Sequence, residues 1–399
     1  MLGAGVFIVW GPALATAGRL LVLAVVLAGL VAAINAASSA QLASRYPVAG
    51  GAYAYGRAEL GRTWGFVAGF AFVVGKTASV AAVALAIGHY AWPDRATLVA
   101  ALAIAASWTI NARGVTRTAA GATAIGAVVL AGVAYLMLAA WRNGPPPVPA
   151  APLAAVDGPT LAGVAAAAAL VFFAFAGYAR IATLGEEVRD PARTIPRAIA
   201  AAFVLVIALY LLVAAVVSSY AEASAFSAGD VPVLELARSV GANAAVAVLA
   251  PLSAFGALLA LTAGIGRTAM AMARERDLPR FFALEDDVGV PWIAEGTSAA
   301  ASIVLVLAGD VTFVLAMSAC AVLVYYAIAN LAAARAARAG RLGELRVPPA
   351  VSSLGALACV ALAASVPWRA SLAAALLLAA GVAVRATVAR RPHGASPIR

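Results

Sequence analysis

The chain has 399 residues, of which 64% are hydrophobic and 11% are charged, and its mean hydropathy is +0.98. Soluble domains carry about 25% charged residues, so this composition excludes a soluble protein. The net charge of +10 does not indicate nucleic-acid binding, because the basic residues are spread between apolar segments rather than gathered in one patch. Apolar stretches of about 18 residues or more recur, which is the length that spans a bilayer as a helix. We therefore predict an all-α polytopic membrane protein.

Twelve membrane spans are predicted in chain order, the first of them a fragment. They cover residues 3–17, 20–42, 64–90, 96–110, 119–141, 161–184, 199–219, 242–272, 293–308, 311–334, 351–366 and 370–389. The segment 143–150, with three consecutive prolines, is expected to be a stiff loop outside the membrane. No segment has the composition of a separate soluble domain, so a single transmembrane domain is expected.

The arginines predict the orientation of these spans. Twenty-one of them lie in the loops after the even-numbered spans and at the C-terminus, whereas five lie in the opposite loops. Cytoplasmic loops are richer in Lys and Arg, so both termini are predicted to be cytoplasmic in a multi-pass protein of the plasma membrane.

Two glycine-containing breaks interrupt spans that are otherwise apolar. The first is GAGVF at residues 3–7, and the second is FAFAGY at residues 173–178. Inside a bilayer, irregular backbone is tolerated only where protein or a water-filled cavity satisfies it. Close helix packing also explains isolated glycines. However, breaks at matching positions of two halves point to the central site of a transporter.

Further motifs carry a resemblance to one family. The segment RYPVAGGAY at 45–53 resembles the family's loop after helix two, and NARGV at 111–115 resembles its turn between helices four and five. EEVRDP at 186–191, followed by IPRAI at 195–199, resembles its cytoplasmic exit from helix six. Segment 267–279 resembles the end of its helix eight. The two breaks resemble those of its helices one and six. With these motifs in order over nearly the whole chain, the protein resembles the amino acid–polyamine–organocation (APC) family of secondary transporters.

The resemblance implies the APC fold, an inverted repeat of five plus five helices with discontinuous helices one and six. It assigns residues 1–141 to the first repeat, 161–334 to the second and 351–389 to two additional helices. In the family, a half-helix precedes the first break, whereas only Met1 and Leu2 precede it here. The first half-helix is therefore expected to be truncated. We expect the true start to lie upstream, and a truncated gene product is the alternative.

The resemblance also implies that the substrate binds at the two breaks. The expected binding residues are Gly3, Ala4, Gly5, Val6, Phe173, Ala174, Phe175, Ala176, Gly177 and Tyr178. A helix that resumes near Val6 would offer free N–H groups to a carboxylate. A helix that stops near Ala174 would offer free carbonyls to an α-ammonium group. The three aromatic residues would wall the pocket or act as gates, with simple packing as the alternative.

The absence of acidic residues limits the substrate class. Many relatives carry a carboxylate at the position of Ala179, which Arg180 follows here. No Asp or Glu lies deep in a predicted span, so a cationic substrate would be buried without a compensating charge. The hypothesis is a neutral amino acid with a small or medium apolar side chain.

Lys76 is the candidate for ion coupling. It is the only lysine in the chain, and it lies about twelve residues into the third span, near the midplane at about 1.5 Å per residue. An ionisable residue at that depth is a functional hypothesis by default, and a buried lysine can gain and lose a proton. In some family members a lysine on helix five replaces a sodium ion, and this chain has none there. A permanent structural tie to carbonyls is the alternative.

The expected function is secondary active transport of an amino acid by proton symport. The alternatives are amino acid exchange and a truncated membrane protein that does not transport. An enzyme is not expected, because the sequence lacks a His/Asp/Glu cluster, a nucleophile elbow and a phosphate loop. No cofactor is expected, and Cys320 and Cys359 lack metal-ligand spacing. The expected partners are a small-molecule substrate, protons and the lipid bilayer, with no nucleic acid.

Overall fold

A computed structural model of the chain describes residues 3–46, 50–114, 119–145, 160–177, 191–222, 231–287, 289–341 and 345–389. Within these ranges the regular structure is entirely helical. Eight helical stretches are long and apolar enough to cross a membrane, and three shorter apolar helices, Leu161–Phe175, Trp292–Ala308 and Pro349–Ser365, accompany them. The prediction of an all-α polytopic membrane protein is confirmed.

A helix lies at the place of each predicted span. The helices are α1 (Gly5–Ile8), α2 (Trp10–Ala17), α3 (Leu21–Arg45), α4 (Ala52–Leu60), α5 (Arg62–Ala91), α6 (Ala96–Ala112), α7 (Ala119–Asn143), α8 (Leu161–Phe175), α10 (Pro191–Glu222), α11 (Pro232–Ser239), α12 (Asn243–Arg274), α13 (Trp292–Ala308), α14 (Val311–Arg338), α15 (Pro349–Ser365) and α16 (Trp368–Ala389). Three short 3-10 turns, η1 (Gly18–Leu20), η2 (Pro93–Arg95) and η3 (Arg280–Ala283), lie between them. The short helices α4 and α11 were not predicted.

Local sequence signals set several helix ends. The side chain of Asp310 accepts a hydrogen bond from the N–H of Phe313 at 2.7 Å and caps the start of α14. Thr160 caps α8 in the same way, accepting from the N–H of Gly163 at 3.0 Å. Gly18 has a positive φ of 53°, a conformation that favours glycine, and it separates α2 from α3.

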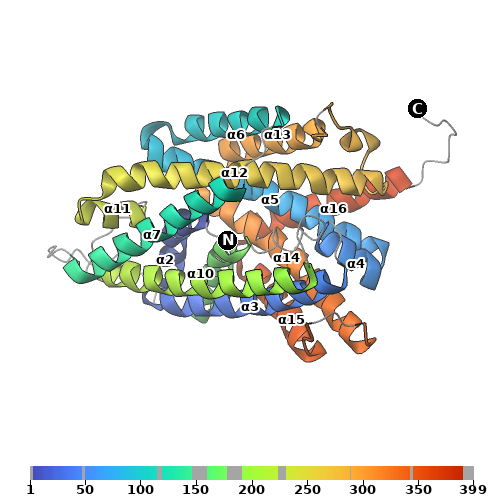
Figure 1. Cartoon of the computed structure of the whole chain (residues 1–399), viewed down its shortest axis with the longest axis horizontal. Helices are drawn as coiled ribbons and strands as arrows, with labels where there is room; N and C mark the ends of the chain where they lie inside the picture. The colour runs from blue at the N-terminus through green and yellow to red at the C-terminus, as the bar shows by residue number, and fades with distance from the viewer. Residues whose placement is uncertain are drawn as a thin grey trace.

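The helices form two packed groups. In one, α5 packs against α6, α12 and α13; in the other, α8 packs against α2 and α3, and α3 packs against α10. Figure 1 shows α6, α12 and α13 toward one side of the molecule and α3 and α10 toward the other, with α5 and α14 between them. The assignment of two inverted repeats, at residues 1–141 and 161–334, remains a prediction.

The central helices are enclosed by protein, whereas the outer ones face away from it. In the most apolar 18-residue stretch of each helix, 83% of the residues are buried for α5 and 78% for α14, whereas only 17% are buried for α16. Leucines such as Leu372 and Leu376 on α16 are correspondingly exposed. In a bilayer such side chains meet lipid tails, which are as apolar as they are.

Two clusters of charged side chains lie at the end of the molecule that the predicted orientation assigns to the cytoplasm. In the first, the buried Asp277 accepts hydrogen bonds from Arg57 (2.7 Å), Arg385 (2.9 Å) and Tyr53 (2.9 Å). These bonds tie α4 and the end of α16 to the segment after α12.

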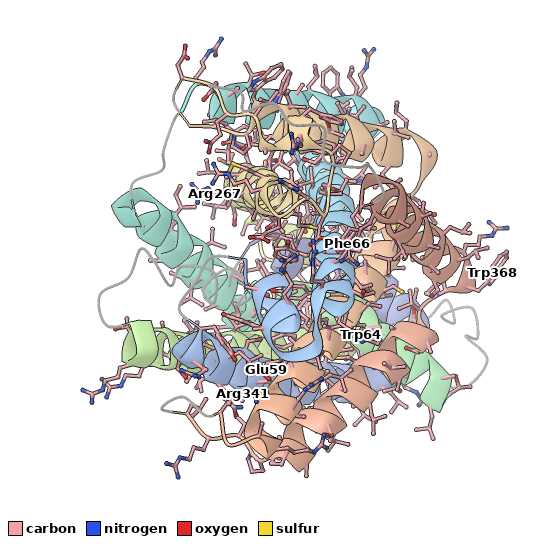
Figure 2. All side chains as sticks on the ribbon, turned by 90° about the vertical axis from the view of Figure 1, so that its right-hand side faces the viewer. Glu59, Trp64, Phe66, Arg267, Arg341 and Trp368 are labelled. Carbon is pink, nitrogen blue, oxygen red and sulfur yellow. The ribbon has the colours of Figure 1, made fainter. Side chains whose placement is uncertain are left out.

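The second cluster is centred on Glu59 of α4, next to Arg341 after α14 (Figure 2). Glu59 accepts hydrogen bonds from Arg341 and from the hydroxyl of Tyr46. Burial alone raises the pKa of Glu59, but these hydrogen bonds outweigh it and hold the pKa below the ordinary value of 4.5.

Candidate functional site at two helix breaks

The first break opens a helical segment that starts at Gly5. Val9, between α1 and α2, keeps helical dihedral angles (φ −78°, ψ −21°), so the segment continues to Ala17 with a bend. At this bend the indole N–H of Trp10 donates a hydrogen bond of 2.7 Å to the carbonyl of Val6. Residues 4–10 are buried, so this backbone lies inside the protein rather than against lipid.

The second break lies at the end of α8. The helix stops at Phe175, and the N–H of Ala176 still reaches the carbonyls of Phe172 and Phe173 at 3.2 and 3.3 Å. Gly177 follows in a turn, and Tyr178 lies outside the described residues. The chain therefore leaves helical geometry within two residues of the predicted position at Ala174.

The structure brings the two breaks into direct contact. A Cβ atom added at Gly5 would lie 2.7 Å from the Cα and 2.8 Å from the Cβ of Ala174. Real Cβ atoms do not approach other atoms so closely, so only glycine allows this contact. Gly3 faces α12, where its added Cβ would lie 3.4 Å from the Cβ of Ala257. The predicted residues 3–6 and 173–177 thus belong to one region of the fold.

The carbonyls at the breaks accept hydrogen bonds from three tyrosines that the sequence analysis did not single out. Tyr210 of α10 donates to Ala174 at 3.0 Å, and Tyr326 of α14 donates to Ala176 at 3.4 Å. Tyr90 of α5 donates to Phe7 at 3.0 Å. Their position inside apolar spans could have indicated these tyrosines from the sequence, because a buried tyrosine hydroxyl usually needs a polar partner.

The aromatic residues of α8 point in different directions. Phe175 is fully buried and packs on Tyr210, with ring centroids 4.9 Å apart, and on Phe203, at 5.9 Å. Phe172, which was not predicted, makes an edge contact with Tyr326 at 5.6 Å. Phe175 therefore faces α10, and this placement favours a packing role for its ring.

Lys76 lies in α5, and the residue is 7% exposed. Its Nζ atom is 5.9 Å from the centre of the Phe72 ring, within the range of a cation–π interaction. No described residue forms a hydrogen bond or ion pair with this ammonium group. The permanent tie to carbonyls that was the alternative explanation is therefore not seen among the described residues.

A series of aromatic contacts leads from Lys76 to the second break. The ring of Phe72 lies 5.3 Å from that of Tyr325, and Tyr325 lies 5.0 Å from Tyr326. Tyr326 in turn donates to the carbonyl of Ala176. Lys76 is thus linked to the break through a series of neighbouring aromatic side chains.

Two cavities among the described residues lie away from the breaks. One, of about 500 Å³, is lined by residues of α4 and α12, including Tyr53, Arg57 and Arg274. The other, of about 390 Å³, lies at the starts of α14 and α16, beside Asp310 and Arg369. The described residues contain no group of three or more His, Cys, Asp or Glu side chains that could hold a metal ion.

In this multi-pass helical membrane protein, the start of the first described helix and the end of α8 touch deep inside the protein. The sequence matches the amino acid permease family over residues 1–383, and the chain belongs to that family. The APC resemblance inferred from the motifs is thereby confirmed. The family points to a transporter of a small molecule rather than to an enzyme.

Individual relatives agree with this assignment. The chain is 43% identical over 398 residues to an uncharacterized transporter of Mycobacterium tuberculosis, covering 98% of this chain and 89% of the relative. It is 26% identical over 313 residues to a branched-chain amino acid permease of Bacillus subtilis, covering 70% and 65%. It is also 26% identical over 317 residues to a methylthioribose transporter of Bacillus subtilis, covering 71% and 66%.

Proposed function

We propose that this protein carries a neutral amino acid across the plasma membrane by secondary active transport coupled to protons, with both termini in the cytoplasm. The observation that carries the proposal is the contact of the two breaks at Gly5 and Ala174, deep in the protein. A substrate held there touches both discontinuous helices at once, so its binding favours one arrangement of them over another.

Backbone groups supply the recognition of the zwitterion in this proposal. The segment that starts at Gly5 directs N–H groups and the positive end of its dipole toward the substrate carboxylate. The carbonyls of Ala174 and Ala176 accept from the ammonium group, which takes the place of the hydroxyls of Tyr210 and Tyr326. No buried formal charge is needed for either contact.

The preference for a neutral side chain rests on the chemistry around the breaks. The described residues of both breaks carry no carboxylate that could offset a cationic side chain. The branched-chain amino acid permease among the relatives supports an apolar substrate. The second candidate is a cationic amino acid, since a cationic amino acid transporter of Arabidopsis thaliana is 30% identical over 242 residues, covering 54% of this chain and 40% of that relative.

Lys76 is the proposed proton-coupling residue. Its ammonium group is buried and has an aromatic ring, rather than a carboxylate, as its described neighbour. Loss of its proton removes a buried charge, and the contacts from Phe72 through Tyr325 and Tyr326 carry the change to the second break. This is a link through a contiguous set of packed side chains.

The test is uptake of labelled alanine and leucine into proteoliposomes, with and without an inward proton gradient. Concentrative uptake driven by the gradient supports symport. Uptake that is independent of the proton gradient and requires amino acid inside the proteoliposomes supports exchange. Uptake of lysine without uptake of alanine or leucine contradicts the neutral substrate.

Two variants separate the role of Lys76 from transport itself. Lys76→Arg keeps the positive charge but holds its proton firmly, and Lys76→Ala removes the charge. Both are expected to lose gradient-driven accumulation while retaining binding of the substrate. If Lys76→Ala accumulates substrate with an undiminished response to the gradient, Lys76 is not the coupling residue, although the transport proposal stands.

A further inference from the structure

Glu295 is a buried acidic residue that the transport proposal does not use. It lies in the first turn of α13, which packs against α5, α6 and α12, and the residue is 2% exposed. Gly266 of α12 faces it, and a methyl group at Gly266 would overlap the Cγ atom of Glu295. The glycine therefore forms a notch in α12 that this side chain fills.

The carboxyl of Glu295 is only partly matched by hydrogen-bond donors among the described residues. Its Oε2 atom is buried and has no hydrogen-bond partner among the described residues. The side-chain amide of Asn111 on α6 donates a hydrogen bond to the carboxyl of Glu295, and its Nδ2 also donates to the carbonyl of Leu259 at 3.0 Å. The indole N–H of Trp108, also on α6, donates to the carbonyl of Trp292 at 3.2 Å.

Charged residues of both signs lie near Glu295. Arg267 on α12 contributes a positive charge, and Asp286, in the connection before α13, contributes a negative one. On the side of α5, the hydroxyl of Ser302 donates to the carbonyl of Thr77 at 2.9 Å, and the charged residue of α5 next to Thr77 in sequence is Lys76. On α6, the neutral side chain of Asn111 faces the carboxyl.

We propose that Glu295 is a proton-binding site, separate from Lys76, where a proton from the cytoplasmic side holds the first turn of α13 in the notch of α12. A buried carboxylate charge with one oxygen lacking a hydrogen-bond donor is costly, and a bound proton removes that cost. The site adjoins the connection 275–291, which the arginine pattern assigns to the cytoplasm. Deprotonation leaves a charge in the notch and weakens the docking of α13.

This proposal does not depend on the transport proposal, because its readouts are stability and proton binding. The experiment measures thermal unfolding of the purified full chain in detergent as a function of pH. Glu295→Gln has the same shape and stays neutral at every pH. The matched control is Glu285→Gln, which removes a carboxylate that is 35% exposed in the neighbouring connection.

The expected result is a wild-type melting temperature that falls as pH rises from about 5 to about 9, because the folded protein holds about one proton at Glu295 that is released on unfolding. Glu295→Gln should lack that component, and Glu285→Gln should retain it. The proposal is wrong if Glu295→Gln follows the wild-type profile.

A second measurement keeps the test decisive if Glu295→Gln does not fold. The infrared spectrum of the wild-type protein is recorded over the same pH series for the carbonyl band of a protonated carboxylic acid. The site is supported by a band that persists at pH values where ordinary carboxyls have lost their proton, and that disappears when the pH is raised further. Absence of such a band in the wild-type protein overturns the proposal.

Discussion

Replacing Gly5 by alanine tests whether the two breaks touch as closely as the structure indicates. The added methyl carbon would lie 2.7 Å from the Cα of Ala174, whereas ordinary van der Waals contacts begin near 3.4 Å. The two segments would have to separate by roughly 0.7 Å, the difference between these distances. Because the clash is with backbone, no side-chain rotation relieves it.

The cost of this substitution follows from the packing of the surroundings. Overpacking a well-filled interior typically costs about 1–3 kcal/mol. A helix-propensity gain of up to about 1 kcal/mol for Gly→Ala offsets part of that. We expect a net loss of about 1–2 kcal/mol in stability, together with a strong loss of substrate transport, because the proposed N–H donors move away from the α8 carbonyls.

The assay compares the thermal unfolding of Gly5→Ala with that of Gly264→Ala. Gly264 lies within α12, and its added Cβ has no neighbour within 4 Å, so this control should be neutral or slightly stabilising. Adding Ala174→Gly should rescue Gly5→Ala only partly, because the Cα of residue 174 remains in place. A Gly5→Ala protein with unchanged melting temperature and uptake would refute the reasoning.

Three further predictions concern groups held by hydrogen bonds or ion pairs. Tyr210→Phe leaves the buried carbonyl of Ala174 without its donor and should cost about 1–3 kcal/mol in thermal unfolding. Asp277→Asn leaves two part-exposed arginines without their carboxylate, and should lower stability by about 3 kcal/mol or less. The pKa of Glu59 is lowered, so the stability that it contributes is present at neutral pH and is lost as pH falls below its ordinary value of 4.5. Acid titration of unfolding should therefore be shallower for Glu59→Gln than for the wild type.

The spans and the approximate positions of the breaks could be predicted from the sequence because the signals for them are local. The first helical segment starts at Gly5, one residue from the predicted Val6, and α8 ends at Phe175, one residue from the predicted Ala174. Both follow from glycine placement and from the length of the apolar run.

The partners of the breaks could not be predicted, because they come from distant parts of the chain. Tyr90 and Tyr326 reach the breaks from α5 and α14, across 83 and 150 residues of sequence. Glu295 was not singled out from the sequence, because its burial depends on packing against Gly266 of another helix. Such contacts are determined by how helices pack, and a single sequence carries no periodic pattern that reports them.

The three tyrosine hydrogen bonds at the breaks differ in which helices they join. Tyr210 links α10 to α8, two helices that both pack with α3, so this bond lies within one packed group. Tyr90 and Tyr326 instead link α5 to α1 and α14 to α8. A movement of the α3, α8 and α10 group against α14 would therefore break the hydrogen bond of Tyr326 and leave that of Tyr210 intact. The energy barrier to such a movement would depend partly on a single hydroxyl group.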